Sequence, residues 1–116
     1  MNDNLGALTA HYDRLRSQKF TVPGVTKSDG KPLVVYFDPP TNAQGQQIRQ
    51  RAGTTDESKI TLYTVIYLAK DENGKRMFED DAATVQALTE NVPGRTLAQI
   101  AGAIMRFSSE ADLGNS

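Results

Sequence analysis

Residues 60–69, ITLYTVIYLA, constrain the fold of this chain more than any other stretch. The stretch carries no charge, and apart from its tyrosine hydroxyls its only polar side chains are Thr61 and Thr64, so water is a poor solvent for it. Burying one large apolar side chain contributes about 1.5 to 3 kcal/mol, and several together rival the net stability of a small domain, about 5 to 15 kcal/mol. We therefore expect this stretch to form either the centre of the core or a docking surface.

The same stretch is ambiguous between strand and helix. Its β-branched and aromatic residues favour a strand. Immediately upstream, however, Thr54 and Glu57 have the spacing of a capping box, and Asp56 and Glu57 are acids suited to the positive end of a helix dipole. Asn73 and Gly74 provide a stop signal downstream. The sequence therefore predicts a helix here.

The N-terminal third predicts one helix and one hairpin. Leu5, Leu8, Tyr12 and Leu15 follow helical spacing, which predicts an amphipathic helix that ends near residue 18. Residues 20–22 and 33–37 are β-branched and aromatic runs, and the connection between them contains glycine and proline. We expect a hairpin whose connection, residues 23–31, is a mobile flap because it is longer than a tight turn requires.

The remaining helices are predicted from caps and apolar spacing. Thr41 with Gln44 and Thr96 with Gln99 repeat the capping-box pattern after Pro40 and Gly94. Two apolar stripes follow helical spacing: Ala82, Val85, Leu88 and, less regularly, Val92; then Leu97, Ile100, Ala101, Ile104 and Phe107.

These elements together predict an α+β, mostly helical single domain over residues 1–116. It has an N-terminal helix, a β-hairpin and three to four following helices. We expect a compact part over about residues 5–107, and a flexible C-terminal tail over residues 108–116, where apolar residues are sparse.

Composition excludes several classes of function. The net charge is −1 and the basic residues are scattered among acids, so we expect no nucleic-acid partner. The chain has no cysteine, which rules out disulfides, thiolate metal sites and a cysteine nucleophile, and suits a reducing compartment. The longest apolar run is about half of the roughly 20 residues that span a bilayer, and the N-terminus does not read as a signal peptide. We expect no membrane partner.

Candidate catalytic and metal-binding residues are few. His11 is the only histidine, and we expect it on a helix surface, without a nucleophile beside it. Residues 71–74 resemble part of a calcium loop but place glycine too early, so a plain turn is favoured. Residues 79–81 are acids expected at a helix start, and the glycines form no phosphate-binding loop. Five basic residues could form a basic patch or a solvated face, and we favour the solvated face. They are Arg14, Arg16, Lys19, Arg49 and Arg51. The sequence predicts no catalytic, cofactor or metal site.

Two tyrosines are the best candidates for contact with a partner. Tyr63 and Tyr67 lie one turn apart on the predicted central helix, and a tyrosine tolerates partial exposure. Core packing with the hydroxyls at its rim is an equally good alternative for both residues.

The order of these segments resembles the tail assembly chaperones of long-tailed bacteriophages over residues 18–107. The resemblance lies in a hairpin ending in PLVVYFDPPT, an apolar helix running into LAKDENGKRMFEDD, an Ala and Leu stripe, and NVPGRTLAQIAGAIM. Its most distinctive part is the turn at residues 71–78, an Asp-x-x-Gly-Lys followed by a Phe and an acidic helix start. The connection at residues 25–31 is longer than the resemblance implies.

The resemblance implies a non-enzymatic protein that acts in viral morphogenesis. It would bind the tape-measure protein, keep that long helical chain soluble and help recruit tail tube subunits, with self-association as copies line up along it. It would work without a cofactor in the host bacterial cytoplasm and be absent from the mature virion. The alternative is a structural phage protein of the tail or head–tail connector that remains in the virion. An enzyme would instead require a cleft that gathers His11 with two carboxylates.

Overall fold

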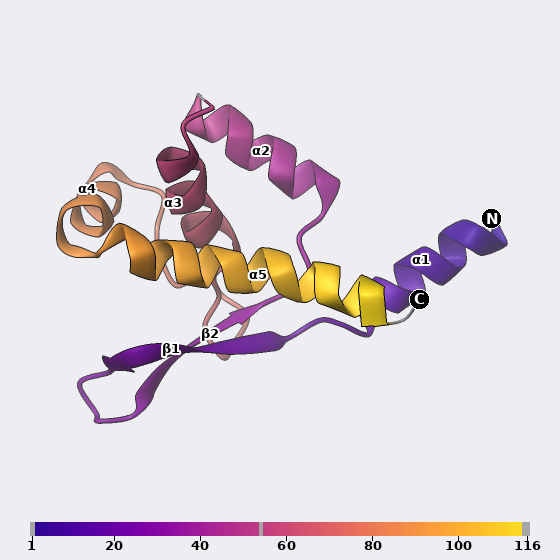
Figure 1. Ribbon diagram of the computed structural model, residues 1–116, viewed down its shortest axis with the longest axis horizontal. Coiled ribbons are helices and arrows are strands. Elements are labelled where there is room, and N and C mark those ends of the chain that lie inside the picture. Colours follow the sequence, from indigo (N-terminus) through magenta and orange to yellow (C-terminus); the bar gives the residue numbers. More distant parts are fainter. Residues whose placement is uncertain (1, 54, 115–116) are drawn as a thin grey trace.

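The computed structural model describes residues 2–53 and 55–114, and only the backbone of residues 107–114. Within these residues the fold is α+β and mostly helical, with an N-terminal helix, a two-stranded antiparallel hairpin and four further helices, as predicted (Figure 1). The elements are α1 (Asp3–Asp13), β1 (Gln18–Thr26), β2 (Pro32–Phe37), α2 (Asn42–Ala52), α3 (Glu57–Leu68), α4 (Ala82–Asn91) and α5 (Gly94–Gly114).

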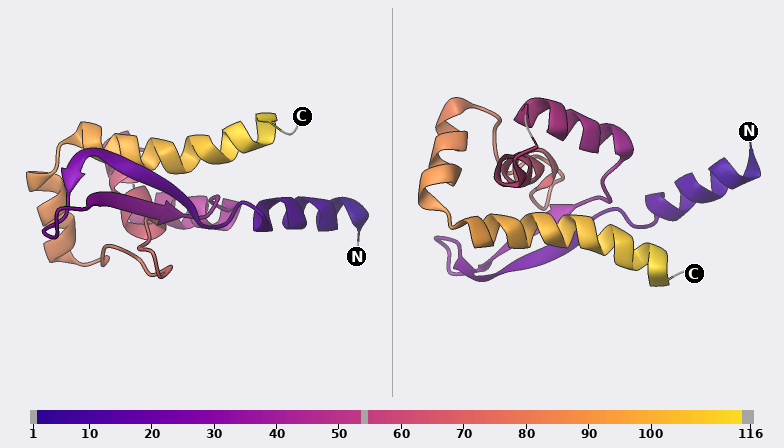
Figure 2. Two further views of the ribbon diagram at one scale, coloured as in Figure 1. Left: turned by 90° about the horizontal axis from the view of Figure 1, so that it is seen from below. Right: turned by 45° about the horizontal axis from the view of Figure 1, so that its top comes forward.

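Helix α3 is the centre of the core. It packs against α2, α4 and α5, and α5 in turn packs on β1 (Figures 1 and 2). Val65 and Ile66 are completely buried, and Tyr63, Thr64 and Leu68 are also buried, so the helix is covered around most of its circumference. The stretch is therefore a helix, as its flanking caps predict, in spite of its β-branched residues, because the surrounding helices decide its conformation.

The helix caps agree only in part with the sequence predictions. Thr41 forms a complete capping box: its hydroxyl accepts from the Gln44 N–H at 3.1 Å, and the Gln44 side chain accepts from the Thr41 N–H at 2.9 Å. For α3, the predicted cap Thr54 lies outside the described residues. The N-cap is Asp56, whose carboxylate accepts from the Ser58 N–H at 2.9 Å.

The predicted start of α5 at Thr96 is wrong. The helix begins two residues earlier at Gly94, and the Pro93 carbonyl accepts from the N–H groups of Thr96 and Leu97. Proline in front of the helix supplies this carbonyl without leaving an N–H of its own unpaired.

The hairpin covers the core from below in Figure 1. Burial alternates along much of its two strands, so alternate residues face the core. Val22, Val35 and Phe37 are almost completely buried. The prediction of a flap over residues 23–31 is wrong in extent, because β1 continues to Thr26 and the turn is closed by the Lys27 N–H, which donates to the Lys31 carbonyl at 2.8 Å. A register irregularity between Thr21 and Thr26 absorbs the extra residues.

Helix α1 projects from the body and, over Asp3–Asp13, buries none of its residues (Figure 1; Figure 2, left). Its apolar residues Leu5 and Leu8 are 52% and 59% exposed. The packed body therefore begins at β1, later than the sequence predicts. At the other end α5 continues as helix to Gly114, beyond the apolar stripe.

A substitution of Asp56 tests whether this N-cap stabilises α3. We expect Asp56→Ala to lower the free energy of unfolding by about 0.5 to 2 kcal/mol, because it leaves an N–H of the first turn without its acceptor. Denaturant unfolding measures the loss. Thr55→Ala, at the exposed neighbouring position, serves as the control and is expected to stay within about 0.5 kcal/mol of wild type. Equal stability of the two variants would contradict this role for Asp56.

Candidate functional site

A groove lies between α3, α4 and α5. Its volume is about 540 Å³, within the range of sites that accept ligands or partner side chains. The groove is lined by Glu57, Ser58, Lys59, Thr61, Leu62, Tyr63, Val85, Thr89, Val92, Gly94, Leu97 and Ala98. The lining combines apolar side chains at Leu62, Val85, Val92, Leu97 and Ala98 with polar ones, and its two charged residues, Glu57 and Lys59, come from the first turn of α3.

The course of the chain leaves this groove unfilled. Leu88 is buried and holds α4 against the core, while Leu62 and Leu97 are buried at the groove and form its base. Two residues, Val92 and Pro93, turn the chain from α4 into α5, so the two helices diverge from one corner (Figure 1). The first residues of α5 that face the groove include Gly94 and Ala98, which have little or no side chain to fill it.

An ion-pair network lies next to the groove and joins α2 and α3 to the segment before α4. The Arg51 guanidinium donates to both carboxylate oxygens of Asp80, at 2.8 and 3.1 Å. The Tyr67 hydroxyl donates to the same carboxylate at 2.7 Å. A bidentate guanidinium pair fixes geometry better than a single contact, so this network fixes the segment that leads into α4.

The two predicted tyrosines belong to this network. Arg51 lies 4.7 Å from the ring centroid of Tyr63, and Arg76 lies 4.6 Å from that of Tyr67. The tyrosine rings meet edge to face at 6.3 Å. Such contacts stabilise and orient the rings.

The structure gives the two tyrosines different positions. Tyr63 is only 8% exposed and contributes to the lining of the groove, whereas Tyr67 is half-buried and does not line it. Their role in partner binding stays a prediction, and the groove gives Tyr63 the more direct route to a partner.

Hydrogen bonds shift the pKa of several carboxyl groups. The Arg51 and Tyr67 hydrogen bonds hold the pKa of Asp80 below its ordinary value, and the Asp80 carboxylate raises the pKa of the Tyr67 hydroxyl. Burial opposes ionisation of Asp38, but the Ser17 N–H and the Lys70 ammonium, 2.9 Å away, together lower its pKa.

The other residues considered from sequence have structural roles. His11 lies on α1 and meets Tyr12 edge to face at 4.8 Å. The Asp71 carboxylate accepts from the N–H groups of Asn73 and Lys75, so the calcium-like segment is a turn. Asp81 caps α4 by accepting from the Thr84 N–H, as expected for a helix start.

Two members of the candidate basic patch are paired with acids. Arg16 pairs with Asp13 at 3.1 Å and Arg51 pairs with Asp80. Among the described residues, no three His, Cys, Asp or Glu side chains gather as a metal site. No helix in the described part of the chain is long and apolar enough to cross a membrane.

Comparisons with protein-family models, curated proteins and solved structures find no match to this chain. The function of the groove therefore has to be inferred from its shape, lining and charge. Tyr63, a predicted contact residue, lines the groove, but the groove itself has no local sequence signal, because its lining comes from three helices whose packing no local pattern specifies. Sequence reasoning also missed the pairing of Arg51 with Asp80, which lie 29 residues apart and carry no shared motif.

The Asp80 network predicts a defined pH dependence of stability. The pKa of Asp80 is lower in the folded chain than its ordinary value of 3.8. The ionised Asp80 therefore contributes fully to stability above pH 3.8, and this contribution is lost as the pH falls through the lowered pKa of the folded chain. We expect the free energy of unfolding to fall on acidification below about pH 4, and Asp80→Asn to make this fall less steep.

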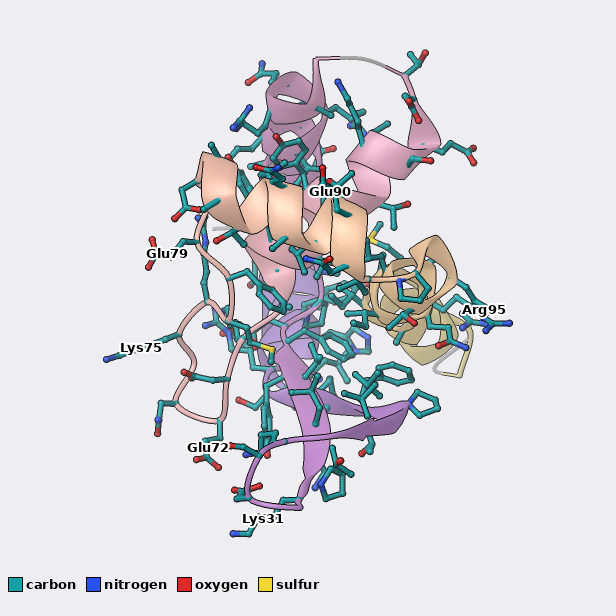
Figure 3. The ribbon with its side chains drawn as sticks, turned by 90° about the vertical axis from the view of Figure 1, so that its left-hand side faces the viewer. Lys31, Glu72, Lys75, Glu79, Glu90 and Arg95 are labelled. Carbon is teal, nitrogen blue, oxygen red and sulfur yellow. The ribbon has the colours of Figure 1, made fainter. Side chains whose placement is uncertain are left out.

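Chemical denaturation at a series of pH values measures this effect. Glu79→Gln, which removes the exposed acid next to Asp80, is the control and is expected to keep the wild-type acid dependence (Figure 3). If Asp80→Asn and wild type lose stability in parallel on acidification, the network does not act in this way.

Proposed function

We propose that this protein is a non-enzymatic binding protein, a bacteriophage tail assembly chaperone. In this proposal, the groove between α3, α4 and α5 binds helical segments of the tape-measure protein. The bound protein keeps these segments soluble and helps recruit tail tube subunits before it leaves the assembled tail.

The observation that carries this proposal is the apolar base of the groove. Leu62 and Leu97 form its base, and Val85 and Val92 line it while remaining partly exposed. An open groove between helices fits an amphipathic helix, which satisfies its own backbone hydrogen bonds and needs to bury only one side.

The rim of the groove favours reversible binding. Ser58, Lys59 and Thr89 are exposed and polar, so they remain solvated around a bound helix. A narrow apolar strip with a polar rim gives moderate affinity, because only the fully desolvated centre contributes strongly. Moderate affinity suits a chaperone that must be released when tube subunits replace it.

The order of the sequence segments supports the choice of client. The hairpin, the buried apolar helix, the turn at residues 71–78 and the final amphipathic helix occur in the order that resembles the tail assembly chaperones. The tape-measure protein is a long helical chain, the class of partner that such a groove accepts. The proposed place of action is the host bacterial cytoplasm, and the protein is not expected in the mature virion.

Blocking the groove should abolish client binding without unfolding the protein. Ala98 is exposed, lies on a helix and lines the groove, so Ala98→Arg places a long charged side chain in the site at little helical cost. After co-expression with a tape-measure protein, we expect pulldown to show binding at least about tenfold weaker.

Ala87→Arg is the matched control, since Ala87 is an exposed alanine of α4 that does not line the groove. It is expected to bind the client as the wild type does. Equal binding by the two variants would refute the groove as the site. Stoichiometric recovery of the protein in purified tails would favour the alternative, a structural component of the virion.

A further inference from the structure

Helix α1 has the pattern of a helix that docks into a groove. Leu5, Leu8 and Tyr12 occupy positions i, i+3 and i+7, the anchor spacing of groove-binding helices. Leu5 and Leu8 are more than half exposed, and α1 buries no residue within the described chain. The N-terminus of the helix is nevertheless capped, because the Asn2 side chain accepts from the Asn4 N–H at 2.7 Å.

The attachment of α1 directs it away from its own groove. The Ser17 N–H donates to Asp38 at 2.9 Å, and the Gln18 side chain donates to the Leu15 carbonyl at 2.7 Å, which fixes the connection between α1 and β1. The molecule is 47 Å long, and α1 projects at one end while α4 and the groove lie at the other (Figure 1; Figure 2, right). A helix of 11 residues, about 16 Å long, does not reach the groove of its own chain from there.

Helix α1 is acidic, whereas the charged side chains of the groove lining are one acid and one base. Between Asp3 and Asp13, both acidic, α1 contains no lysine or arginine. Lys59 lines the groove, and Arg95, which follows the lining residue Gly94, points outward from the body (Figure 3). The N-termini of α3 and α5 also meet at the groove and add partial positive charge, although Glu57 of the lining opposes it.

We propose that α1 of one copy occupies the α3–α4–α5 groove of a second copy when no client is bound. This contact covers Leu5 and Leu8 of one copy and the apolar base of the groove of the other. It joins different surfaces on the two copies, so it is heterologous and propagates head to tail into open chains. The inference rests on the proposed function in one respect: a client helix would displace α1 from the groove.

Cross-linking tests the contact without any client. The chain has no cysteine, so Thr9→Cys on α1 and Ala98→Cys in the groove introduce single reactive sites. Both residues are exposed, and Thr9 lies beside Leu5 and Leu8, which remain in place. When the two variants are mixed with a short bismaleimide, we expect the 9–98 product to exceed that of a 9–87 control pair, Thr9→Cys with Ala87→Cys, at least about tenfold.

A charge on α1 should remove this cross-link. Leu8→Asp, added to the Thr9→Cys chain, changes an exposed side chain and so leaves the fold intact while opposing burial in the groove. We expect it to lower the 9–98 product to the level of the control pair. An unchanged yield, equal yields for 98 and 87, or a dominant 9–9 product would each overturn the proposal.

The size of the assemblies separates a head-to-tail contact from a symmetric one. We expect sedimentation velocity to show a mean mass that rises past two copies with concentration, and Leu8→Asp to remain monomeric. Growth that stops at two copies, or none at all, contradicts head-to-tail association.

A client peptide tests the displacement step separately. An excess of a synthetic helical segment of the tape-measure protein is expected to reduce the 9–98 product. If the cross-link forms but the segment leaves it unchanged, α1 docking stands and the assignment of the client to the groove fails.

Discussion

The burial of α3 is the constraint on which the rest of the structure depends. Val65 and Ile66 reach zero exposure, which requires cover from several directions, and α2, α5 and α4 supply it. Cover is thinner over the first turns of α3, where residues 57–59 are exposed. There, Thr61 stays partly exposed, and α4 and α5 diverge to form the groove. The candidate site therefore results from the way α4 and α5 pack over the first turns of α3.

The network around Asp80 links this core to the site. Arg51 from α2 and Tyr67 from α3 converge on one carboxylate in the segment that enters α4. Because Arg51 also lies over the ring of Tyr63, the same cation holds the segment before α4 and orients a residue of the groove lining. The position of α4, and with it the width of the groove, thus depends partly on electrostatic contacts as well as on Leu88.

The sequence predicts much of the fold because its local signals are strong. The Thr41 capping box, the acids before α4 and the helical spacing in α5 all correspond to helices. The N-cap of α3 differs from the prediction because Asp56, an acid nearer to the helix, caps it. The length of β1 differs from the prediction because the strand continues through Gly24, at φ 74°, with an irregular register. The groove and the free position of α1 depend on packing between distant segments, and no spacing of Leu5 and Leu8 distinguishes a helix that packs on its own core from one that projects.

We propose that the groove binds an amphipathic helix from another chain. Amide chemical shifts of the isotope-labelled protein, recorded while a helical tape-measure segment is added, test it most directly. The account predicts changes concentrated at the groove, at residues such as Thr61, Val85 and Ala98. Changes confined to the hairpin and the turn at residues 71–78, or no changes at saturating segment, would contradict it.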